Sequence, residues 1–380
     1  MVHKYHMDHV DYYCAAPFRH IAVDNIAPDR YRPCCVWQGT SQPAQVSAAA
    51  AFDSDHMQQL RLDMQANRKN PGCAICHGHD QSSGDSLRQS FNRLYDRPIE
   101  PQLRDIEFNL GNLCNMRCRM CTSSSSSRWQ ADDKRLGRTS HPLVRRTAAD
   151  LNVDLAQLDR IKFIGGEITL EQDEVIAVLQ GIDLARGGLS HLSVEIITNG
   201  MLLLQQEVID LLLQCRHVDV VISLDGMQAS NDYQRSEGKW SEIVAAARYY
   251  DALANGRFCP GIISTISCLT VADAPELMDF VTCELPGSWH VINALLWPAE
   301  LSVRNMPDPY KQQIKQQLES WIPRLDKSRH QEWRGRILQD MAAPQDTDIV
   351  SVRKMLQELD DLRGETLQQC LPDLYSAYFS

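Results

Sequence analysis

The chain has 380 residues, of which 43% are hydrophobic and 23% charged, and its formal net charge is -11 at pH 7. This composition is typical of a globular protein with a large core, and the negative charge argues against a broad nucleic-acid-binding surface. No stretch is apolar over the length of a membrane span, and the N-terminus lacks an apolar signal region, so we expect a cytoplasmic protein. Its thirteen cysteines then indicate metal binding, because the cytosol keeps thiols reduced.

Residues 1–103 contain few long periodic runs, and they hold separated cysteines. Four thiolates from such segments can complete either a cubane iron-sulfur cluster or a tetrahedral zinc site. The metal ligands that we predict here are Cys14, Cys34, Cys73 and Cys76. Cys35 remains an alternative to Cys34, because adjacent cysteines cannot easily both bind one cluster. We therefore predict a small cysteine-rich module that precedes the main domain.

From residue 105 onward, short apolar runs alternate with longer helical patterns, which is typical of repeated βα units and a parallel sheet. The six predicted strands are 105–110, 160–164, 192–197, 218–224, 262–268 and 289–296. The predicted helices between and after them are 171–184, 202–215, 241–254, 274–283, 309–321, 331–341 and 349–363. This order predicts an α/β fold with a partial (β/α)6 barrel of TIM type over 104–300, followed by a C-terminal helical extension over 301–380.

The first predicted barrel strand leads into a loop that holds Cys114, Cys118 and Cys121. Three thiolates on a short loop can hold three corners of a 4Fe-4S cluster, whose fourth iron stays open to a ligand that is not protein. A structural zinc site is the alternative, although zinc sites usually use paired units that complete a tetrahedron. The remaining cysteines stand singly in apolar or helical contexts and are expected to pack as small hydrophobic residues. They are Cys215, Cys259, Cys268, Cys283 and Cys370.

Glycine-rich and polar sequences follow the next three predicted strands, at the carboxyl ends where parallel barrels place their reactive groups. These sequences are Gly165-Gly166-Glu167, Thr198-Asn199-Gly200 and Ser223-Leu224-Asp225-Gly226. Glycines let a ligand approach the backbone, carboxylates pair with ammonium groups, and short polar side chains donate or accept hydrogen bonds. Each sequence alone is an ordinary turn or helix-capping sequence. Their occurrence at successive strand ends after the cysteine loop favours ligand binding.

Together, the cysteine spacing, the Gly-Gly-Glu sequence and the other strand ends resemble the radical S-adenosylmethionine (SAM) superfamily. The resemblance implies a 4Fe-4S cluster on Cys114, Cys118 and Cys121 whose open iron binds SAM. It further implies that SAM is cleaved to a 5'-deoxyadenosyl radical, which abstracts hydrogen from a substrate. The residues that it places around SAM are Met120, Gly165, Gly166, Glu167, Thr198, Asn199, Ser223 and Asp225. For Met120, expected beside the adenine, ordinary loop packing is the alternative.

The upstream cysteines are similar to the auxiliary-cluster modules called twitch or SPASM domains, although those usually follow the barrel. This resemblance implies a second 4Fe-4S cluster on the predicted upstream set, where it would accept the substrate electron or hold the substrate. The partners that we expect are a peptide or small-molecule substrate and an electron donor such as flavodoxin or ferredoxin. We expect neither a membrane nor a nucleic acid as a partner.

The sequence therefore predicts a radical SAM enzyme that oxidises or modifies a peptide or protein. Oxidation of a small molecule, such as a sugar, an alcohol or a nucleoside, is the alternative within the superfamily. In a different class, the chain would be a non-catalytic interaction protein whose two cysteine groups are structural zinc sites. The sequence assigns no hydrogen-accepting residue or general base, and it does not identify the substrate.

Overall fold

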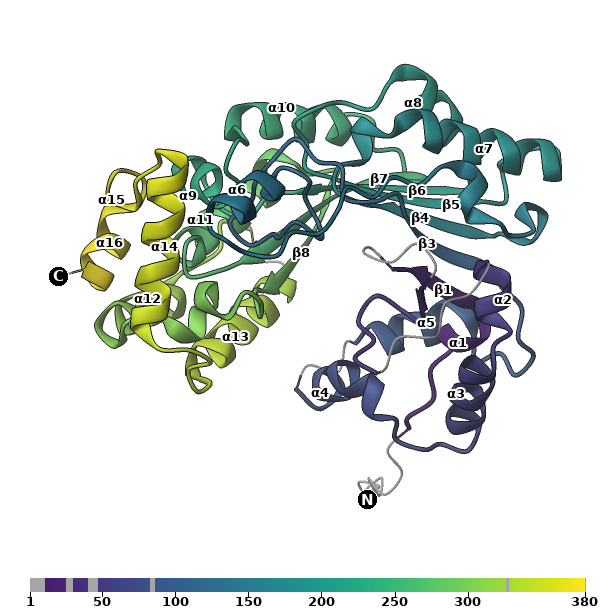
Figure 1. The fold of residues 1–380 in the computed structure, drawn as a ribbon, viewed down its shortest axis with the longest axis horizontal. Helices are drawn as coiled ribbons and strands as arrows, with labels where there is room; N and C mark the ends of the chain where they lie inside the picture. The colour runs from purple at the N-terminus through teal and green to yellow at the C-terminus, as the bar shows by residue number, and fades with distance from the viewer. Residues whose placement is uncertain (1–10, 25–29, 40–46, 83–85, 326–327, 380) are drawn as a thin grey trace. The chain divides into compact units, whose positions relative to one another are not determined.

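The computed structural model describes residues 11–24, 30–39, 47–82, 86–325 and 328–379 (Figure 1). The chain forms two compact units, one made of residues 1–109 and 146–162 and the other of residues 110–145 and 163–380. The division predicted from the sequence, at residues 103 and 300, stays a prediction. Within the described ranges, no helix combines the length and the apolar character needed to cross a membrane.

The first unit is built on short strands that are covered by short helices. Strand β1 (His20–Val23) pairs antiparallel with β2 (Tyr31–Arg32) and parallel with β3 (Asp105–Asn109), with Ile21 opposite Ile106. All residues of β1 and β3 are buried, as expected for strands covered on both faces. The helices are α1 (Ala16–Arg19), α2 (Ala48–Phe52), α3 (Asp55–Gln65), α4 (Ala74–Ser82) and α5 (Leu87–Tyr95).

A buried carboxylate at the start of β3 holds this unit together. Asp105 lies 3.1 Å from His20 Nδ1 and 3.2 Å from Arg160 Nη1, and it accepts a 2.9 Å hydrogen bond from the Tyr95 hydroxyl. Burial opposes the ionisation of Asp105, but His20 and Arg160 outweigh this effect and hold its pKa at about 2. The ionised carboxylate therefore stabilises the unit at neutral pH.

The second unit contains the last five of the six strands predicted from the sequence, whereas the first, predicted over 105–110, is β3 of the first unit. Their order is β4 (Arg160–Ile164, whose last two residues belong to this unit), β5 (Ser193–Thr198), β6 (His217–Ser223), β7 (Phe258–Ile266) and β8 (Trp289–Ala294). Val220 of β6 lies opposite Ile196 of β5 and Pro260 of β7 in parallel register. Strand β7 begins at Phe258, several residues before the start predicted at residue 262, and Pro260 and Gly261 pair with β6.

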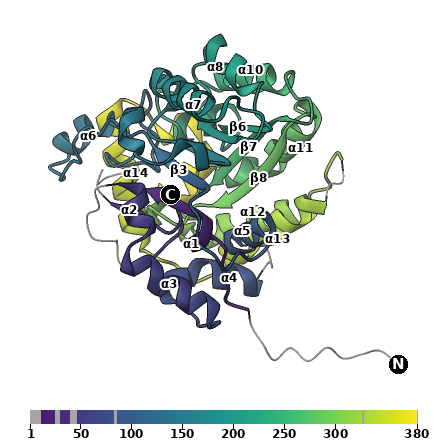
Figure 2. The ribbon, with the colours of Figure 1, turned by 90° about the vertical axis from the view of Figure 1, so that its right-hand side faces the viewer.

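Helices alternate with these strands. They are α6 (Trp129–Arg135), α7 (Gln172–Arg186), α8 (Gln206–Leu212), α9 (Gln228–Gln234), α10 (Trp240–Asp251) and α11 (Ala274–Glu284). Helices α7, α8 and α10 cover one side of the strands, as both ribbon views show (Figures 1 and 2). The predicted α/β class, with barrel-type βα units, is thereby confirmed.

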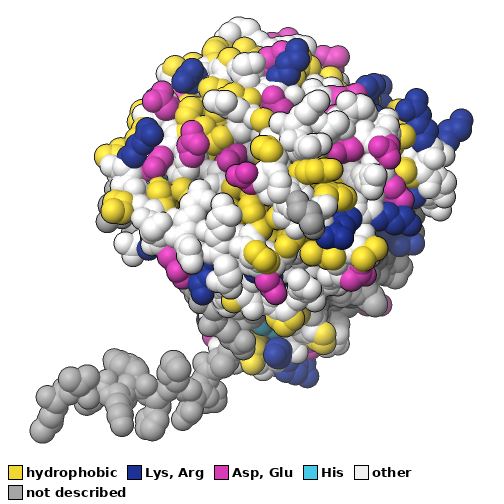
Figure 3. Space-filling view, turned by 90° about the vertical axis from the view of Figure 1, so that its left-hand side faces the viewer, with side chains coloured by type: hydrophobic (Ala, Val, Ile, Leu, Met, Phe, Trp, Pro, Cys, Tyr) yellow, Lys and Arg dark blue, Asp and Glu magenta, His cyan; other side chains and the backbone are white. Residues whose placement is uncertain are grey.

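The end of the chain is helical, as predicted. Its helices are α12 (Asp308–Ser320), α13 (Ser328–Ala342), α14 (Ile349–Arg363), α15 (Leu367–Cys370) and α16 (Pro372–Phe379). Helix α14 is capped by Gly364, which follows its last residue, has a φ of 68° and donates its N–H to the Asp360 carbonyl at 2.8 Å. The surface at this end carries acidic and basic side chains interspersed with apolar ones (Figure 3).

Candidate functional site

The three loop cysteines lie together in a buried cluster of sulfur-containing side chains. Cys114 is 9% exposed and Cys118 is 6% exposed, while Cys121 is half-buried and packs against them. The Cys121 N–H donates a 3.0 Å hydrogen bond to the Cys118 carbonyl, which closes a tight turn between these two residues. The methionines of this cluster are Met116, Met120 and Met201. The loop therefore presents three neighbouring thiols in an apolar setting.

The surroundings of these thiols favour ionisation at one of them. Burial raises the pKa of Cys114 to about 12. A hydrogen bond from Cys121 lowers the pKa of Cys118 against the effect of burial, and the Arg235 guanidinium lowers it further. Arg235 Nη1 lies 3.9 Å from Cys118 Sγ. Because the thiolate is the form that binds metal, Cys118 is the loop cysteine best prepared for this role.

Arg235 is held against Cys118 by a buried ion pair. Its Nε lies 2.7 Å from Asp225 Oδ2, and the two side chains are 6% and 0% exposed. Asp225 Oδ1 accepts a 2.8 Å hydrogen bond from the Thr265 N–H, and Gln234 Nε2 donates to Oδ2 at 2.9 Å. Asp225, predicted from the sequence to contact SAM, thus faces Arg235 and β7 in the structure. A contact between Asp225 and SAM stays a prediction.

The Gly-Gly-Glu sequence after β4 lies against the segment that leads into the cysteine loop. The Gly166 N–H donates to the Gly111 carbonyl and the Glu167 N–H to the Leu113 carbonyl, both at 2.8 Å. A Cβ atom on Gly166 would lie 2.3 Å from the Leu113 carbonyl oxygen, closer than any side chain can approach. Gly166 therefore permits the two backbones to meet just before Cys114.

The Glu167 carboxylate joins three of the predicted segments. It is buried, and its Oε1 accepts hydrogen bonds from the Thr169 N–H at 3.0 Å and from the Thr198 hydroxyl at 2.6 Å. Its Oε2 accepts the Asn199 N–H at 2.7 Å, and Asn199 Nδ2 donates to Asn115 Oδ1 at 2.7 Å. The structure thereby brings the ends of β4 and β5 to the cysteine loop. Ser223 is half-buried at the end of β6.

Arg119, which the sequence analysis did not single out, anchors the loop from within. It is fully buried, and its Nη2 lies 2.6 Å from Asp360 Oδ1 and 2.7 Å from Glu365 Oε2. Its guanidinium also stacks on the Tyr233 ring at 3.7 Å from the centroid. Its position between Cys118 and Cys121 is a sequence signal for a role at the loop. The sequence does not indicate its partners, because Asp360 and Glu365 lie more than two hundred residues further along the chain.

A second arginine reaches the loop from the last residue of α14. Arg363 Nη2 lies 2.9 Å from Asp132 Oδ2, and its Nη1 donates to the Arg117 carbonyl at 2.8 Å. The guanidinium lies 4.6 Å from the centroid of the Trp129 ring, and Trp129 Nε1 donates to the Cys118 carbonyl at 2.9 Å. The end of α14 is therefore part of the structure that holds the cysteine loop.

The upstream cysteines approach one another inside the first unit. Burial, with a smaller contribution from the Cys73 and Cys76 thiols, raises the pKa of Cys14 to about 12. Burial also raises the pKa of Cys34, and the neighbouring thiols of Cys35, Cys14 and Cys76 contribute to this increase. Cys35 is exposed, so the placement favours Cys34 as the fourth member of the predicted set. Over the described ranges, no three His, Cys, Asp or Glu side chains are arranged to hold a single metal ion.

Comparison with known families places the cysteine loop in a defined domain. Residues 108–281, a little under half of the chain, match the family model of the Radical SAM superfamily. This segment is a radical SAM domain. It begins in β3, ends in α11, and contains the three loop cysteines together with the glycine-rich and polar strand ends. No curated protein matches the chain.

Several solved structures resemble the chain at low identity. Streptococcus suis SuiB bound to SAM is 14% identical, with 57% of this chain and 44% of that chain covered and a TM-score of 0.35. Native anSMEcpe with bound SAM is 17% identical, with 58% of this chain and 61% of that chain covered and a TM-score of 0.41. SuiB bound to precursor peptide SuiA is 11% identical, with 93% of this chain and 74% of that chain covered and a TM-score of 0.38. The chain thus spans less than two thirds of the length of the first two structures.

Proposed function

We propose that the protein is a radical SAM enzyme in which Cys114, Cys118 and Cys121 hold a 4Fe-4S cluster. When bound, the cluster and SAM supply a 5'-deoxyadenosyl radical that abstracts hydrogen from the substrate. The observation that carries the proposal is the group of three neighbouring loop cysteines, two buried and one half-buried, inside a segment that matches the radical SAM family model. Its donor chemistry fits the cluster, because cysteine thiolates are the usual ligands of iron-sulfur centres.

The chain's own residues prepare this site for SAM. Gly166 permits the segment after β4 to pack against the backbone just before Cys114, and the hydrogen bonds from Thr198 and Asn199 fix the direction of the Glu167 carboxylate. A fixed carboxylate is suited to an ammonium group. The residues proposed to contact SAM are Met120, Gly165, Gly166, Glu167, Thr198, Asn199, Ser223 and Asp225. Asp225 also positions Arg235 beside Cys118.

The first unit is proposed to hold an auxiliary 4Fe-4S cluster on Cys14, Cys34, Cys73 and Cys76. The mutual influence of these thiols supports the set. A peptide or protein is proposed as the substrate, since the resemblance of this module to twitch and SPASM modules favours it. A reducing protein such as flavodoxin or ferredoxin would supply electrons. The thirteen free cysteines agree with a reducing compartment such as the cytoplasm.

Cleavage of SAM tests the proposal directly. Protein purified without oxygen and reconstituted with iron and sulfide is expected to be brown and to release 5'-deoxyadenosine when reduced with dithionite in the presence of SAM. Cys118→Ala is expected to abolish this release, because a cluster ligand is lost. Cys283→Ala, a matched change on α11 outside the site, is expected to retain it. A colourless wild-type protein that binds zinc and forms no 5'-deoxyadenosine would refute the proposal.

The auxiliary cluster is tested by iron analysis of a second pair of cysteine variants. Cys73→Ala is expected to lose about half of the iron of the reconstituted protein, because one of two 4Fe-4S clusters is lost. It is expected to keep some cleavage of SAM in the absence of substrate. Cys35→Ala, at the exposed neighbour of Cys34, is expected to keep all of the iron. Full iron in Cys73→Ala would rule out the proposed ligand set.

A further inference from the structure

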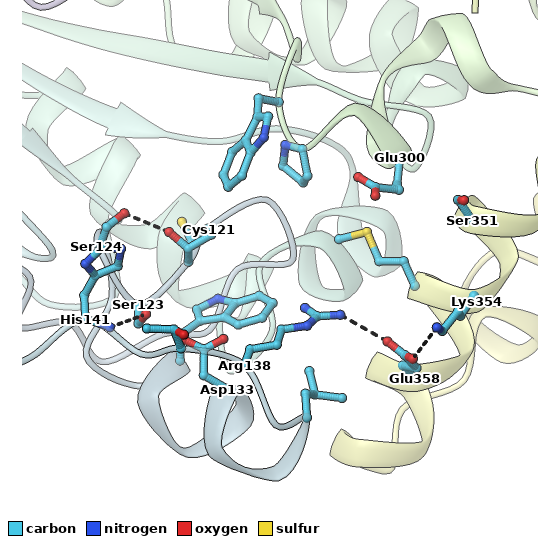
Figure 4. A pocket seen from close by; sticks show the side chains of 17 residues that line it. Cys121, Ser123, Ser124, Asp133, Arg138, His141, Glu300, Ser351, Lys354 and Glu358 are labelled. Carbon is cyan, nitrogen blue, oxygen red and sulfur yellow. Dashed lines mark hydrogen bonds and ion pairs between the residues drawn. The ribbon is translucent and has the colours of Figure 1, made fainter. Parts of the chain in front are cut away.

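A cavity of about 770 Å³ opens beside the cysteine loop within the second unit. Its wall is formed by residues 121–124, by helix α6 and the loop after it, by the segment after β8, and by α14 (Figure 4). The volume falls in the range of about 300 to 1,000 Å³ that is usual for ligand pockets. Because Cys121 lines this cavity, a molecule bound in it lies next to a thiol of the candidate cluster site.

The wall of the cavity carries more carboxylates than lysine and arginine side chains. Arg138 and Lys354 both approach Glu358, at 3.1 Å and 3.7 Å, so one carboxylate engages the two cations. Asp133 and Glu300 also line the cavity, and neither pairs with another side chain within the part of the chain that the structure describes. Two carboxylates of the wall are thus left without a cation.

Asp133 is the more informative of these two carboxylates. Its side chain extends from α6 toward the cavity (Figure 4), although the residue is only 6% exposed. The preceding residue, Asp132, is 1% exposed but is paired with Arg117 at 3.0 Å and with Arg363 at 2.9 Å. Burying an unpaired carboxylate destabilises a protein, since the group loses water and gains no partner. A cationic ligand would supply the partner that Asp133 lacks.

An indole at the rim adds a second feature suited to a cation. Trp297, in the segment after β8, lines the cavity and is 64% exposed. Tryptophan is the aromatic side chain that attracts cations most strongly, and its ring also packs on the aliphatic stem of a lysine or arginine. Figure 4 shows Glu300 across the cavity from Asp133, so the two carboxylates face a ligand from opposite sides.

We propose that this cavity binds an ammonium or guanidinium group of the substrate, with Asp133 as its ion-pair partner and Glu300 as a second acidic contact. That the bound molecule is the substrate rests on the proposed function, whereas the binding of a cation rests on the cavity alone. The group belongs either to a lysine or arginine side chain of a peptide or to a small diffusible polyamine. Both sources share the chemistry that an unpaired carboxylate recognises.

Calorimetric titration of the reconstituted protein tests this site with three probes: a pentalysine peptide, the same peptide acetylated on its lysines, and spermidine. Pentalysine, spermidine or both are expected to bind, more weakly as salt is raised, and the acetylated peptide is expected not to bind. Binding by pentalysine alone identifies a peptide source, and tighter binding by spermidine identifies a small molecule. Equal binding of the acetylated peptide would overturn the proposal.

Variants of the cavity wall locate the binding. Asp133→Asn is expected to weaken binding of the cationic probe at least tenfold, and Glu300→Gln is expected to weaken it less. Glu319→Gln makes the same charge change on the exposed side of α12 and is expected to leave binding unchanged. If Asp133→Asn binds as tightly as the wild type, the assignment of this cavity is wrong.

Thermal unfolding separates loss of the site from loss of the fold. Asp133→Asn removes an unpaired buried charge, so its melting temperature is expected to equal or exceed that of the wild type. A lower melting temperature would contradict the unpaired state of the carboxylate. The cleavage of SAM is measured separately. Failure of cleavage with intact cation binding refutes the proposed function, whereas the reverse result refutes only the cavity assignment.

Discussion

Replacing Arg119 with methionine is expected to lower the free energy of unfolding of the second unit by about 3 kcal/mol or more. The guanidinium is fully buried and is bound by Asp360 and Glu365 at 2.6 Å and 2.7 Å. Methionine replaces much of the apolar stem but leaves both carboxylates without their cation. It also removes the stacking on Tyr233. Because Arg119 lies between Cys118 and Cys121, the loop is expected to take up less iron as well.

Arg138→Met is the matched control for this change. Arg138 also pairs with a carboxylate of α14, Glu358 at 3.1 Å, but these side chains are 43% and 33% exposed. Exposed ion pairs contribute only about 0 to 1 kcal/mol, so urea unfolding of Arg138→Met is expected to stay close to that of the wild type. Equal unfolding curves for the two variants, or full iron content in Arg119→Met, would contradict an anchoring role for Arg119.

The contacts of Arg119 and Arg363 give the end of the chain a structural role in the site. Arg119 of the loop pairs with Asp360 of α14 and with Glu365 just after this helix. Arg363, the last residue of α14, pairs with Asp132 of α6. Sequence periodicity predicts α14 as a helix, but it gives no indication of where the helix packs. The C-terminal helices are thus part of the support of the loop.

The sequence predicts the barrel strands because each is a short apolar run that ends in a polar or glycine-rich turn. It also predicts that the cysteine loop and the Gly-Gly-Glu turn belong to one site. Their backbones meet because Gly166 carries no side chain. It does not predict the pairing of Arg119 with Asp360, which are separated by 241 residues. Neither hydrophobic periodicity nor residue spacing reports on ion pairs formed between distant segments.

The bounds of the helices in the first unit do not follow from hydrophobic periodicity, for a different reason. Serine caps mark their starts at Ser47, Ser54 and Ser86, where each side chain accepts an N–H from the first turn. The helices that follow are 5, 11 and 9 residues long. Isolated helices of this length are marginal in water and depend on tertiary packing, so a periodic pattern has little length in which to appear.

Separate replacement of Asp225 and Arg235 is expected to destabilise the second unit by about 3 to 5 kcal/mol in each case, because each change leaves a buried charge without its partner. In Asp225→Asn the Arg235 guanidinium loses the carboxylate at 2.7 Å. In Arg235→Met the carboxylate keeps its hydrogen bonds from the Thr265 N–H and from Gln234. The loss is therefore expected to be somewhat smaller in Arg235→Met than in Asp225→Asn.

The double variant distinguishes a coupled pair from two independent residues. Asp225→Asn with Arg235→Met is expected to destabilise less than the sum of the single changes, by up to about 3 kcal/mol, because neither charge is left alone. A cycle on the exposed pair of Lys239 and Glu242 is expected to give a coupling of only about 0.3 to 0.5 kcal/mol. Additive effects at Asp225 and Arg235 would contradict their pairing. A large coupling would show that the strand-end carboxylate and the guanidinium beside Cys118 stabilise the second unit as a pair.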